Sequence, residues 1–168
     1  MKTMNSTILS QLINLTSQAG EIIMNLRANS ANYSIKTDNT PVTSADKASH
    51  ELIVNTLQKL TPDIPILSEE SSHIPFLTRQ SWNEYWLIDP LDGTRDFIDG
   101  SPDFCISIAL IRDKYPIFGL IYSPFNKTHY YRLENNSSIK LVNKTKSTIL
   151  TTKPKRWEKI VVGRYSNN

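Results

Sequence analysis

The sequence has a single cysteine, Cys105, among its 168 residues, so no disulfide bond can form within the chain. A lone thiol is typical of proteins in a reducing compartment. No stretch approaches the roughly 20 consecutive apolar residues that a membrane-spanning helix needs. Polar residues also interrupt the N-terminal segment, which argues against a signal peptide. These absences predict a cytoplasmic protein without a membrane span.

Acidic residues are scarce near the end of the sequence. Residues 140–168 carry eight Lys or Arg and one acid, Glu158, whereas residues 1–139 carry 11 basic and 15 acidic residues. A basic tail can contact nucleic acid or another polyanion. Because no nucleic-acid motif and no interleaved aromatic residues accompany it, we favour a solvated basic surface over a nucleic-acid-binding module.

Two amphipathic helices are predicted in the first part of the chain. Apolar residues recur at steps of three and four and predict a helix over 6–27, capped by Ser6 or Thr7. A second helix is predicted to start near Thr43–Ser44 and to end before Pro62, because proline cannot continue a helix. The apolar faces are Ile8, Leu12, Leu15, Ala19, Ile22 and Leu26 in the first helix and Ala45, Ala48, Leu52, Ile53, Leu57 and Leu60 in the second.

After the second helix, short apolar or alternating segments predict β-strands. Short turns between neighbouring strands predict antiparallel pairing. The predicted strands are 64–67, 85–88, 104–110, 116–122, 128–133, 139–142, 149–152 and 159–163. The fold class is therefore α+β, with two helices packed on one face of a mainly antiparallel sheet, and the length fits one domain.

Acidic residues gather at the ends of two predicted strands and at the start of the second helix. Glu69 follows one strand, Asp89 and Asp92 follow the next, and Asp46 lies in the first turn of the helix. The proline and glycine beside Asp89 and Asp92 permit a tight turn that aims both carboxylates and the Leu91 carbonyl at one point. Oxygen ligands of this kind suit Mg²⁺, and Glu69 could supply a third carboxylate.

Electrostatics makes the metal hypothesis testable. Two carboxylates about 5 Å apart repel by roughly 3 kcal/mol at an effective dielectric constant of about 20, so a converging group needs a cation or protons. An isolated Asp-x-x-Asp-Gly is nevertheless common in turns, and Asp46 alone could simply stabilise a helix start. An EF-hand is excluded, because Leu91 and Gly93 stand where that loop needs acidic residues.

The remaining reactive residue types receive no chemical role from the sequence. His50, His73 and His129 are scattered along the chain, and Glu70 is interpreted as a solvated neighbour of the preceding acid. Cys105 lies within a predicted strand without a basic neighbour, so we interpret it as a core residue rather than a nucleophile.

Three motifs together resemble the inositol monophosphatase family of metal-dependent phosphatases. Asp89–Thr94 resembles the family's Asp-Pro-(Ile/Leu)-Asp-Gly-Thr motif, Glu69–Glu70 its upstream acidic pair, and Thr43–Asp46 its Thr-x-x-Asp helix start. The likeness is greatest to the family's bacterial 3′(2′),5′-bisphosphate nucleotidase branch. The segments that carry this finer likeness are 36–46, 67–70 and 95–97.

The resemblance implies a Mg²⁺-dependent site with two or more ions, inhibited by Li⁺ or Ca²⁺. It implies that Glu69, Asp89 and the Leu91 carbonyl bind one ion, and that Asp89 and Asp92 bind a second. The implied substrate is adenosine 3′,5′-bisphosphate, converted to AMP and phosphate in the clearance of a by-product of sulfate assimilation. An inositol-1-monophosphatase and a non-catalytic remnant that binds Mg²⁺ or phosphate are the alternatives.

The catalytic residues that the resemblance implies are Asp46, Thr94 and Glu69. Thr94 would orient the attacking water, with Asp46 behind it, and the backbone N–H groups of Gly93 and Thr94 could hold a phosphate oxygen. The implied substrate-binding residues are Glu69, Leu91, Asp92, Gly93 and Thr94.

The resemblance further implies that residues 1–168 correspond to the N-terminal, metal-binding α/β layers of the family's sugar-phosphatase fold. Family members continue into another α/β layer that carries a Trp-Asp metal-binding motif, and residues 158–168 resemble only its start. We therefore expect a C-terminally truncated chain with a weakened site, low or no turnover, and self-association through uncovered apolar faces. A cytoplasmic location is implied, with peripheral contact to the inner membrane also open.

Overall fold

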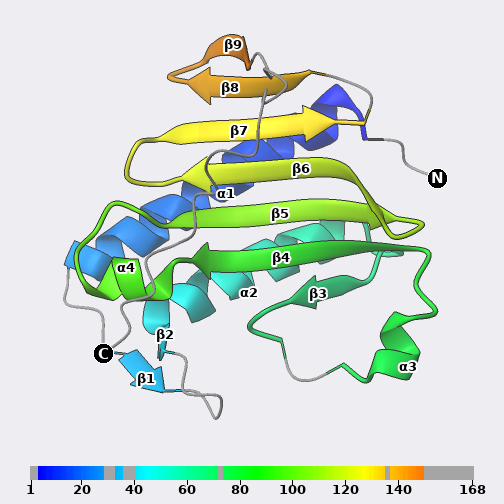
Figure 1. The fold of residues 1–168 in the computed structure, drawn as a ribbon, viewed down its shortest axis with the longest axis horizontal. Coiled ribbons are helices and arrows are strands. Elements are labelled where there is room, and N and C mark those ends of the chain that lie inside the picture. The colour runs from blue at the N-terminus through cyan, green and yellow to red at the C-terminus, as the bar shows by residue number, and fades with distance from the viewer. Residues whose placement is uncertain (1–3, 29–32, 36–40, 72–73, 135–136, 150–168) are drawn as a thin grey trace, which may run out of the picture.

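The computed structural model describes residues 4–28, 33–35, 41–71, 74–134 and 137–149. The helices are α1 (Ser6–Ala28), α2 (Ser44–Leu60), α3 (Phe76–Arg79) and α4 (Thr94–Ile98). The strands are β1 (Tyr33–Ile35), β2 (Pro41–Thr43), β3 (Ile66–Ser68), β4 (Glu84–Asp92), β5 (Cys105–Arg112), β6 (Tyr115–Ser123), β7 (Thr128–Leu133), β8 (Ser138–Val142) and β9 (Thr145–Ile149) (Figure 1).

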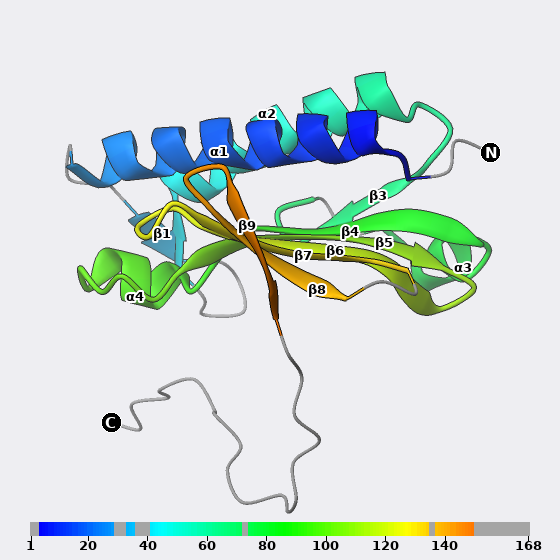
Figure 2. The same cartoon turned by 90° about the horizontal axis from the view of Figure 1, so that it is seen from above.

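The strands β3 to β9 form one seven-stranded sheet whose spatial order is the order along the chain. Only β3 and β4 pair in parallel, and the other neighbours in this sheet are antiparallel. Strands β1 and β2 form a separate hairpin. Helices α1 and α2 lie along one face of the large sheet (Figure 2), so the α+β expectation is confirmed.

Several boundaries differ from the sequence prediction. The strand predicted to end at residue 88 continues as β4 through the acidic residues to Asp92, with an irregular register between Asp89 and Asp92. The strand predicted at 149–152 overlaps the described residues only at Ile149, the last residue of β9, and residues 150–152 lie outside the described residues. Strand β9 begins earlier than predicted, at Thr145, because it pairs with β8 across a two-residue turn. The strand predicted at 159–163 lies outside the described residues. The short elements β1, β2, α3 and α4 were not predicted.

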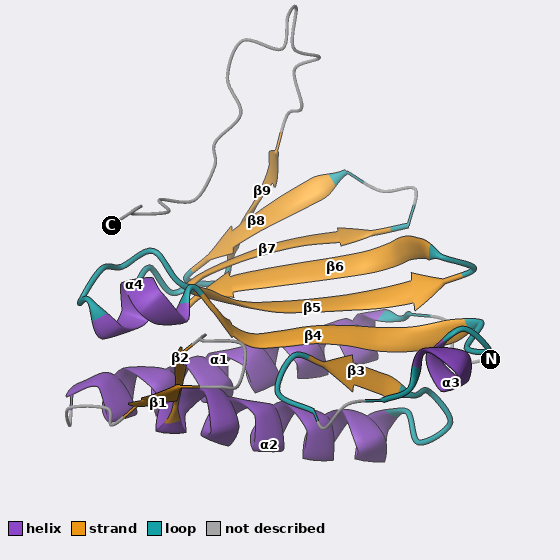
Figure 3. Ribbon diagram, turned by 60° about the horizontal axis from the view of Figure 1, so that its bottom comes forward, coloured by secondary structure: helices purple, strands orange, loops and turns teal. Residues whose placement is uncertain are grey.

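The core lies between the two long helices and the inner face of the sheet. Trp86 is fully buried there, meets Phe118 edge to face and donates its indole N–H to Thr61 Oγ1 at 2.9 Å. On α1, Gly20 permits close packing, since a Cβ at this position would lie 2.5 Å from the ring of Tyr122. The chain thus positions both helices by side-chain packing against the central strands, and α2 runs beside β3 and β4 (Figure 3).

The outer face of the sheet has a different character. One outward row crosses four strands in register and consists of Asp89, Ser107, Ile121 and Tyr130. Leu87 and Ile121 expose 42% and 47% of their surfaces on this side. None of the described helices is long and apolar enough to cross a membrane.

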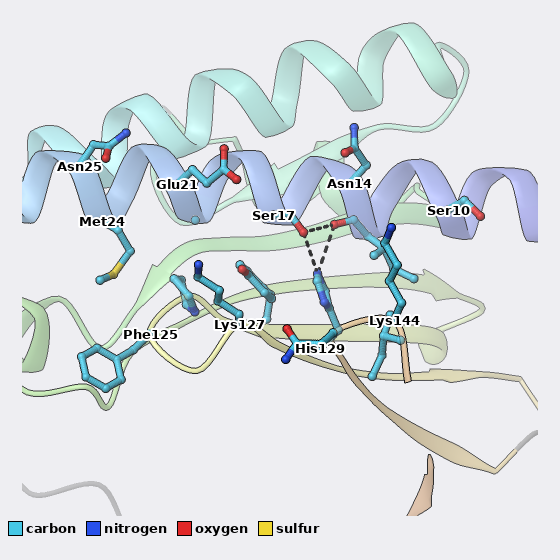
Figure 4. A pocket seen from close by; sticks show the side chains of 16 residues that line it. Ser10, Asn14, Ser17, Glu21, Met24, Asn25, Phe125, Lys127, His129 and Lys144 are labelled. Atoms are coloured by element: carbon cyan, nitrogen blue, oxygen red, sulfur yellow. Dashed lines mark hydrogen bonds between the residues drawn. The ribbon is translucent and has the colours of Figure 1, made fainter. Parts of the chain in front are cut away.

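A groove of about 760 Å³ lies between α1 and the turns that connect β6 to β7 and β8 to β9 (Figure 4). Its floor contains His129, which stacks on Tyr122 with ring centroids 4.1 Å apart. The Nε2 atom of His129 lies 3.2 Å from the Ile13 carbonyl oxygen and 3.1 Å from Thr16 Oγ1. Because a carbonyl can only accept, Nε2 carries a proton, and a neutral imidazole suffices for these contacts.

Burial lowers the pKa of His129 from its ordinary 6.5 to about 4. Between pH 6.5 and pH 4, His129 is therefore protonated in the unfolded chain but neutral in the folded chain. The free energy of unfolding decreases as the pH falls toward 4. We expect this residue to remove up to about 2 kcal/mol of unfolding free energy between pH 7 and pH 5. Denaturant titrations at both pH values, on the wild type and on His129→Gln, measure the difference. Parallel pH profiles of the two proteins would contradict the expectation.

Candidate metal centre

The parallel pairing of β3 with β4 brings two predicted site residues to the same edge of the sheet. Ser68 at the end of β3 lies beside Ile88, and the backbone N–H of Glu69 donates to the Ile88 carbonyl at 3.1 Å. Glu69 therefore follows β3 at the level where Asp89 follows Ile88 in β4. The Glu69 carboxylate lies close enough to the Asp89 side chain to raise its pKa.

Asp89 is partly buried and lies near two other carboxylates. Burial and then the negative charges of Glu69 and Asp92 raise the pKa of Asp89 to about 7. The N–H of Leu91, which donates to Asp89 Oδ1 at 3.2 Å, acts in the opposite direction. A nearby divalent cation would relieve the repulsion and favour the ionised form.

Asp92 is exposed and is paired across the sheet with Cys105. The Sγ atom of Cys105 lies 3.8 Å from Asp92 Oδ2. Burial, together with the Asp92 and Asp89 charges, raises the pKa of Cys105 to about 11, so the thiol stays protonated. The interpretation of Cys105 as a core residue was wrong, because its position in β5 alternates with buried Ile106 and faces the outer side of the sheet.

Asp46 is fixed by the start of α2. The backbone N–H and the hydroxyl of Thr43 both contact Asp46 Oδ2, at 2.7 and 2.5 Å, and the Thr43 hydroxyl caps the helix in return. This capping box leaves Asp46 Oδ1 to accept from the Thr94 hydroxyl at 3.0 Å. Thr94 Oγ1 is also 3.2 Å from the Leu91 carbonyl oxygen, so three predicted site residues meet here.

Gly93 connects β4 to α4 in a conformation that suits glycine. Its φ is +92°, and a Cβ would lie 2.8 Å from the Asp103 carbonyl oxygen. This turn reverses the chain directly after Asp92 and places Thr94 at the first position of α4.

The predicted site residues thus form two adjoining groups. Glu69 and Asp92 are both near enough to Asp89 to raise its pKa, while Asp46, Thr94 and the Leu91 carbonyl form the second group. Within the described ranges, no three Asp, Glu, His or Cys side chains are arranged to hold a metal ion as they stand. The donor set still fits Mg²⁺, because it consists of hard oxygen atoms and carries a negative charge that raises the pKa of Asp89.

Sequence reasoning missed the polar residues behind the site. Ser49 on α2 donates to the Pro90 carbonyl at 2.8 Å, and His50 Nδ1 lies 2.9 Å from Ser68 Oγ. Arg79 of α3 lines a hollow of about 630 Å³ that Glu69 and Asp89 also border. The spacing of Ser49 and His50 from Asp46 on α2 is the only sequence signal that could have indicated them.

Comparisons with known proteins agree on one family. The family model described as the inositol monophosphatase family matches residues 4–164. The 3′(2′),5′-bisphosphate nucleotidase CysQ of Aggregatibacter actinomycetemcomitans is 40% identical over 140 residues, which cover 83% of this chain and 52% of that protein. The chain spans about half the length of the curated relatives it matches.

Solved structures show the same fold. CysQ from Bacteroides thetaiotaomicron, a bacterial member of the inositol monophosphatase family, is 34% identical with a TM-score of 0.65, over 78% of this chain and 47% of that chain. An IMPase/NADP phosphatase solved in complex with Mg²⁺ and phosphate is 22% identical, with a TM-score of 0.70 over 80% of this chain and 50% of that chain.

Proposed function

Because the chain belongs to the inositol monophosphatase family, we propose that it forms the metal-binding domain of a Mg²⁺-dependent phosphomonoesterase. The proposed reaction converts adenosine 3′,5′-bisphosphate to AMP and phosphate. The observation that carries the proposal is that the pairing of β3 with β4 brings Glu69 and Asp89 to the same sheet edge, where the charges of Glu69 and Asp92 raise the pKa of Asp89. The single thiol and the proposed substrate favour the cytoplasm as its location.

Glu69, Asp89, Asp92 and the Leu91 carbonyl are the groups that would hold Mg²⁺. When bound, the metal would neutralise phosphate charge and lower the pKa of a coordinated water. Occupancy by two or more ions and inhibition by Li⁺ or Ca²⁺ belong to the same proposal. The donor chemistry supports it, since the negative charges of Glu69 and Asp92 raise the pKa of Asp89.

Thr94 and Asp46 are proposed to move a proton. The Thr94 hydroxyl donates to Asp46 Oδ1, which leaves lone pairs on Thr94 Oγ1 for a proton from the attacking water. As Oγ1 takes that proton, its own proton passes to Asp46 Oδ1. The Thr43 cap holds the other oxygen of Asp46, so the accepting oxygen cannot turn away. The backbone N–H groups of Gly93 and Thr94 are proposed to hold a phosphate oxygen.

We propose a nucleotide substrate rather than an inositol phosphate because the relatives named as nucleotidases are more similar in sequence to this chain. The relatives named 3′(2′),5′-bisphosphate nucleotidase share about 40% identity with this chain, whereas the IMPase/NADP phosphatase shares 22%. A non-catalytic protein that binds Mg²⁺ or phosphate is the second candidate, because no three Asp, Glu, His or Cys side chains in the described part of the chain are arranged to hold a metal ion as they stand.

The outer face of the sheet supports a further part of the proposal, self-association of two copies. Leu87 and Ile121 are exposed there, and Ala109 and Gly119 between them are small enough for another backbone to approach closely. A Cβ at Gly119 would meet nothing within 4 Å, so this strip is open.

Phosphate release tests the proposed reaction. With Mg²⁺, the chain is expected to release phosphate at a low rate, and from adenosine 3′,5′-bisphosphate in preference to inositol 1-phosphate. Asp89→Asn is expected to abolish release, and Thr94→Ala to lower it by about 100-fold, in the range for loss of a proton-transfer group. Glu51→Gln, an exposed acid on α2, serves as the control. Mg²⁺ binding without release above the Asp89→Asn level would leave the non-catalytic candidate in its place.

Metal binding is tested separately by stability. At pH 8 and without metal, Asp89→Asn is expected to raise the unfolding free energy by about 1–2 kcal/mol, because it removes a charge that neighbours repel and burial disfavours. Mg²⁺ is expected to raise the melting temperature of the wild type and of Glu51→Gln, but not of Asp89→Asn. Equal responses of all three proteins to Mg²⁺ would overturn the assignment of the metal ligands.

Light scattering tests self-association. The wild type is expected to give a mass above that of one chain, and Ile121→Lys to give a monomer, because a charge on the outer face opposes its burial. Phe125→Lys is the matched control, since Phe125 is 52% exposed but borders the groove beside α1. A monomeric wild type, or equal masses for wild type and Ile121→Lys, would exclude this interface.

A further inference from the structure

One face of α2 reaches every segment that carries a proposed site residue. Asp46, Ser49 and His50 stand three and four residues apart and therefore project from the same side of the helix. Asp46 contacts Thr94 at the start of α4, as described above. The other two residues contact the ends of the two strands that carry the carboxylates, and none of the motifs in the sequence includes them.

Ser49 controls the orientation of one peptide plane in β4. Its side chain is fully buried, and its hydroxyl donates to the Pro90 carbonyl at 2.8 Å. No cis peptide bond occurs among the described residues, so the N–H of Leu91 points away from that carbonyl, on the far side of the same rigid plane. This N–H donates to Asp89 Oδ1 at 3.2 Å. Ser49 therefore orients the Asp89 carboxylate through a single planar group.

His50 contacts the end of β3 in a similar way. Its Nδ1 atom lies 2.9 Å from Ser68 Oγ, and Ser68 is 5% exposed and directly precedes Glu69. The next N–H, that of Glu69, donates to the Ile88 carbonyl in β4 at 3.1 Å. The contact with His50 thus joins the end of β3 to α2 at the residue directly before Glu69.

We propose that Ser49 and His50 are positioning residues of the metal centre, which hold Asp89 and Glu69 in mutual register from adjacent positions on α2. The proposal rests on the proposed function for its consequence, which is tighter Mg²⁺ binding. Partners behind metal ligands typically contribute about 10- to 100-fold to metal affinity. A side chain that merely packs would change stability and leave the affinity of the folded protein unaltered.

The first measurement is calorimetric titration with Mg²⁺ on the full 168-residue chain. Ser49→Ala and His50→Leu are each expected to weaken binding by about 10-fold or more. His50→Gln, whose amide can still bond Ser68 Oγ, is expected to stay within about threefold of the wild type. Thr56→Ala is the control on the same helix, because the Thr56 hydroxyl bonds only the Leu52 carbonyl of α2 among the contacts described.

The second measurement is amide hydrogen exchange without metal. It measures how well the backbone hydrogen bonds beside Asp89 and Glu69 are held. Exchange at the Leu91 N–H is expected to be about tenfold faster in Ser49→Ala, and exchange at the Glu69 N–H about tenfold faster in His50→Leu. Circular dichroism establishes that each variant is folded. Because this readout does not depend on the metal, it decides the proposal even for a variant whose Mg²⁺ titration is flat.

The outcomes separate this proposal from the proposed function. Faster exchange at the named amides together with weaker Mg²⁺ binding supports both. Unchanged exchange in Ser49→Ala and His50→Leu overturns the positioning role, whatever the metal does. In a third outcome, exchange is faster in Ser49→Ala and His50→Leu, but Mg²⁺ affects the wild type and Asp89→Asn equally. That outcome supports the positioning role and contradicts the proposed function.

Discussion

The cost of holding several carboxylates together at one sheet edge is the constraint on which the rest of the structure depends. A pair about 5 Å apart repels by roughly 3 kcal/mol at an effective dielectric constant of about 20, which is a large part of the 5–15 kcal/mol by which a domain is typically stable. The raised pKa of Asp89 is the local sign of this cost. The parallel pairing of β3 with β4 and the polar contacts of α2 contribute favourable free energy against this cost and hold the two strand ends in place.

The parts of the fold that could be predicted from the sequence are those with local causes. The three-and-four spacing of apolar residues gives α1 and α2 to within one or two residues, since each helix buries one stripe. Alternation gives the central strands, and Pro62 gives the end of α2. The motif at Asp89–Thr94 indicates the site because its composition is unusual, and the structure places Thr94 against Asp46 from 48 residues away.

The rest depends on contacts between distant segments, which no local pattern encodes. In the sequence, Ser49 is an ordinary small polar residue of a helix, and its partner, the Pro90 carbonyl, lies in β4. His50 likewise bonds Ser68 in β3, so neither contact can be read from neighbouring residues. The extension of β4 through Asp92 follows from its pairing with β5, not from its proline and glycine content. Cys105 was misassigned for the same reason, because which side of a strand faces the helices is decided by the whole sheet.

The identity of chain order and strand order in the large sheet has a consequence for biosynthesis. Each hairpin from β4 onward can add to the previous one as soon as it leaves the ribosome, with no strand waiting for a distant partner. The two long helices, by contrast, must wait for their packing partners. They are made first, and their apolar stripes stay uncovered until β4, β5 and β6 have emerged. During that interval the nascent chain exposes the apolar surface of α1 and α2, and exposed surface of this kind promotes aggregation.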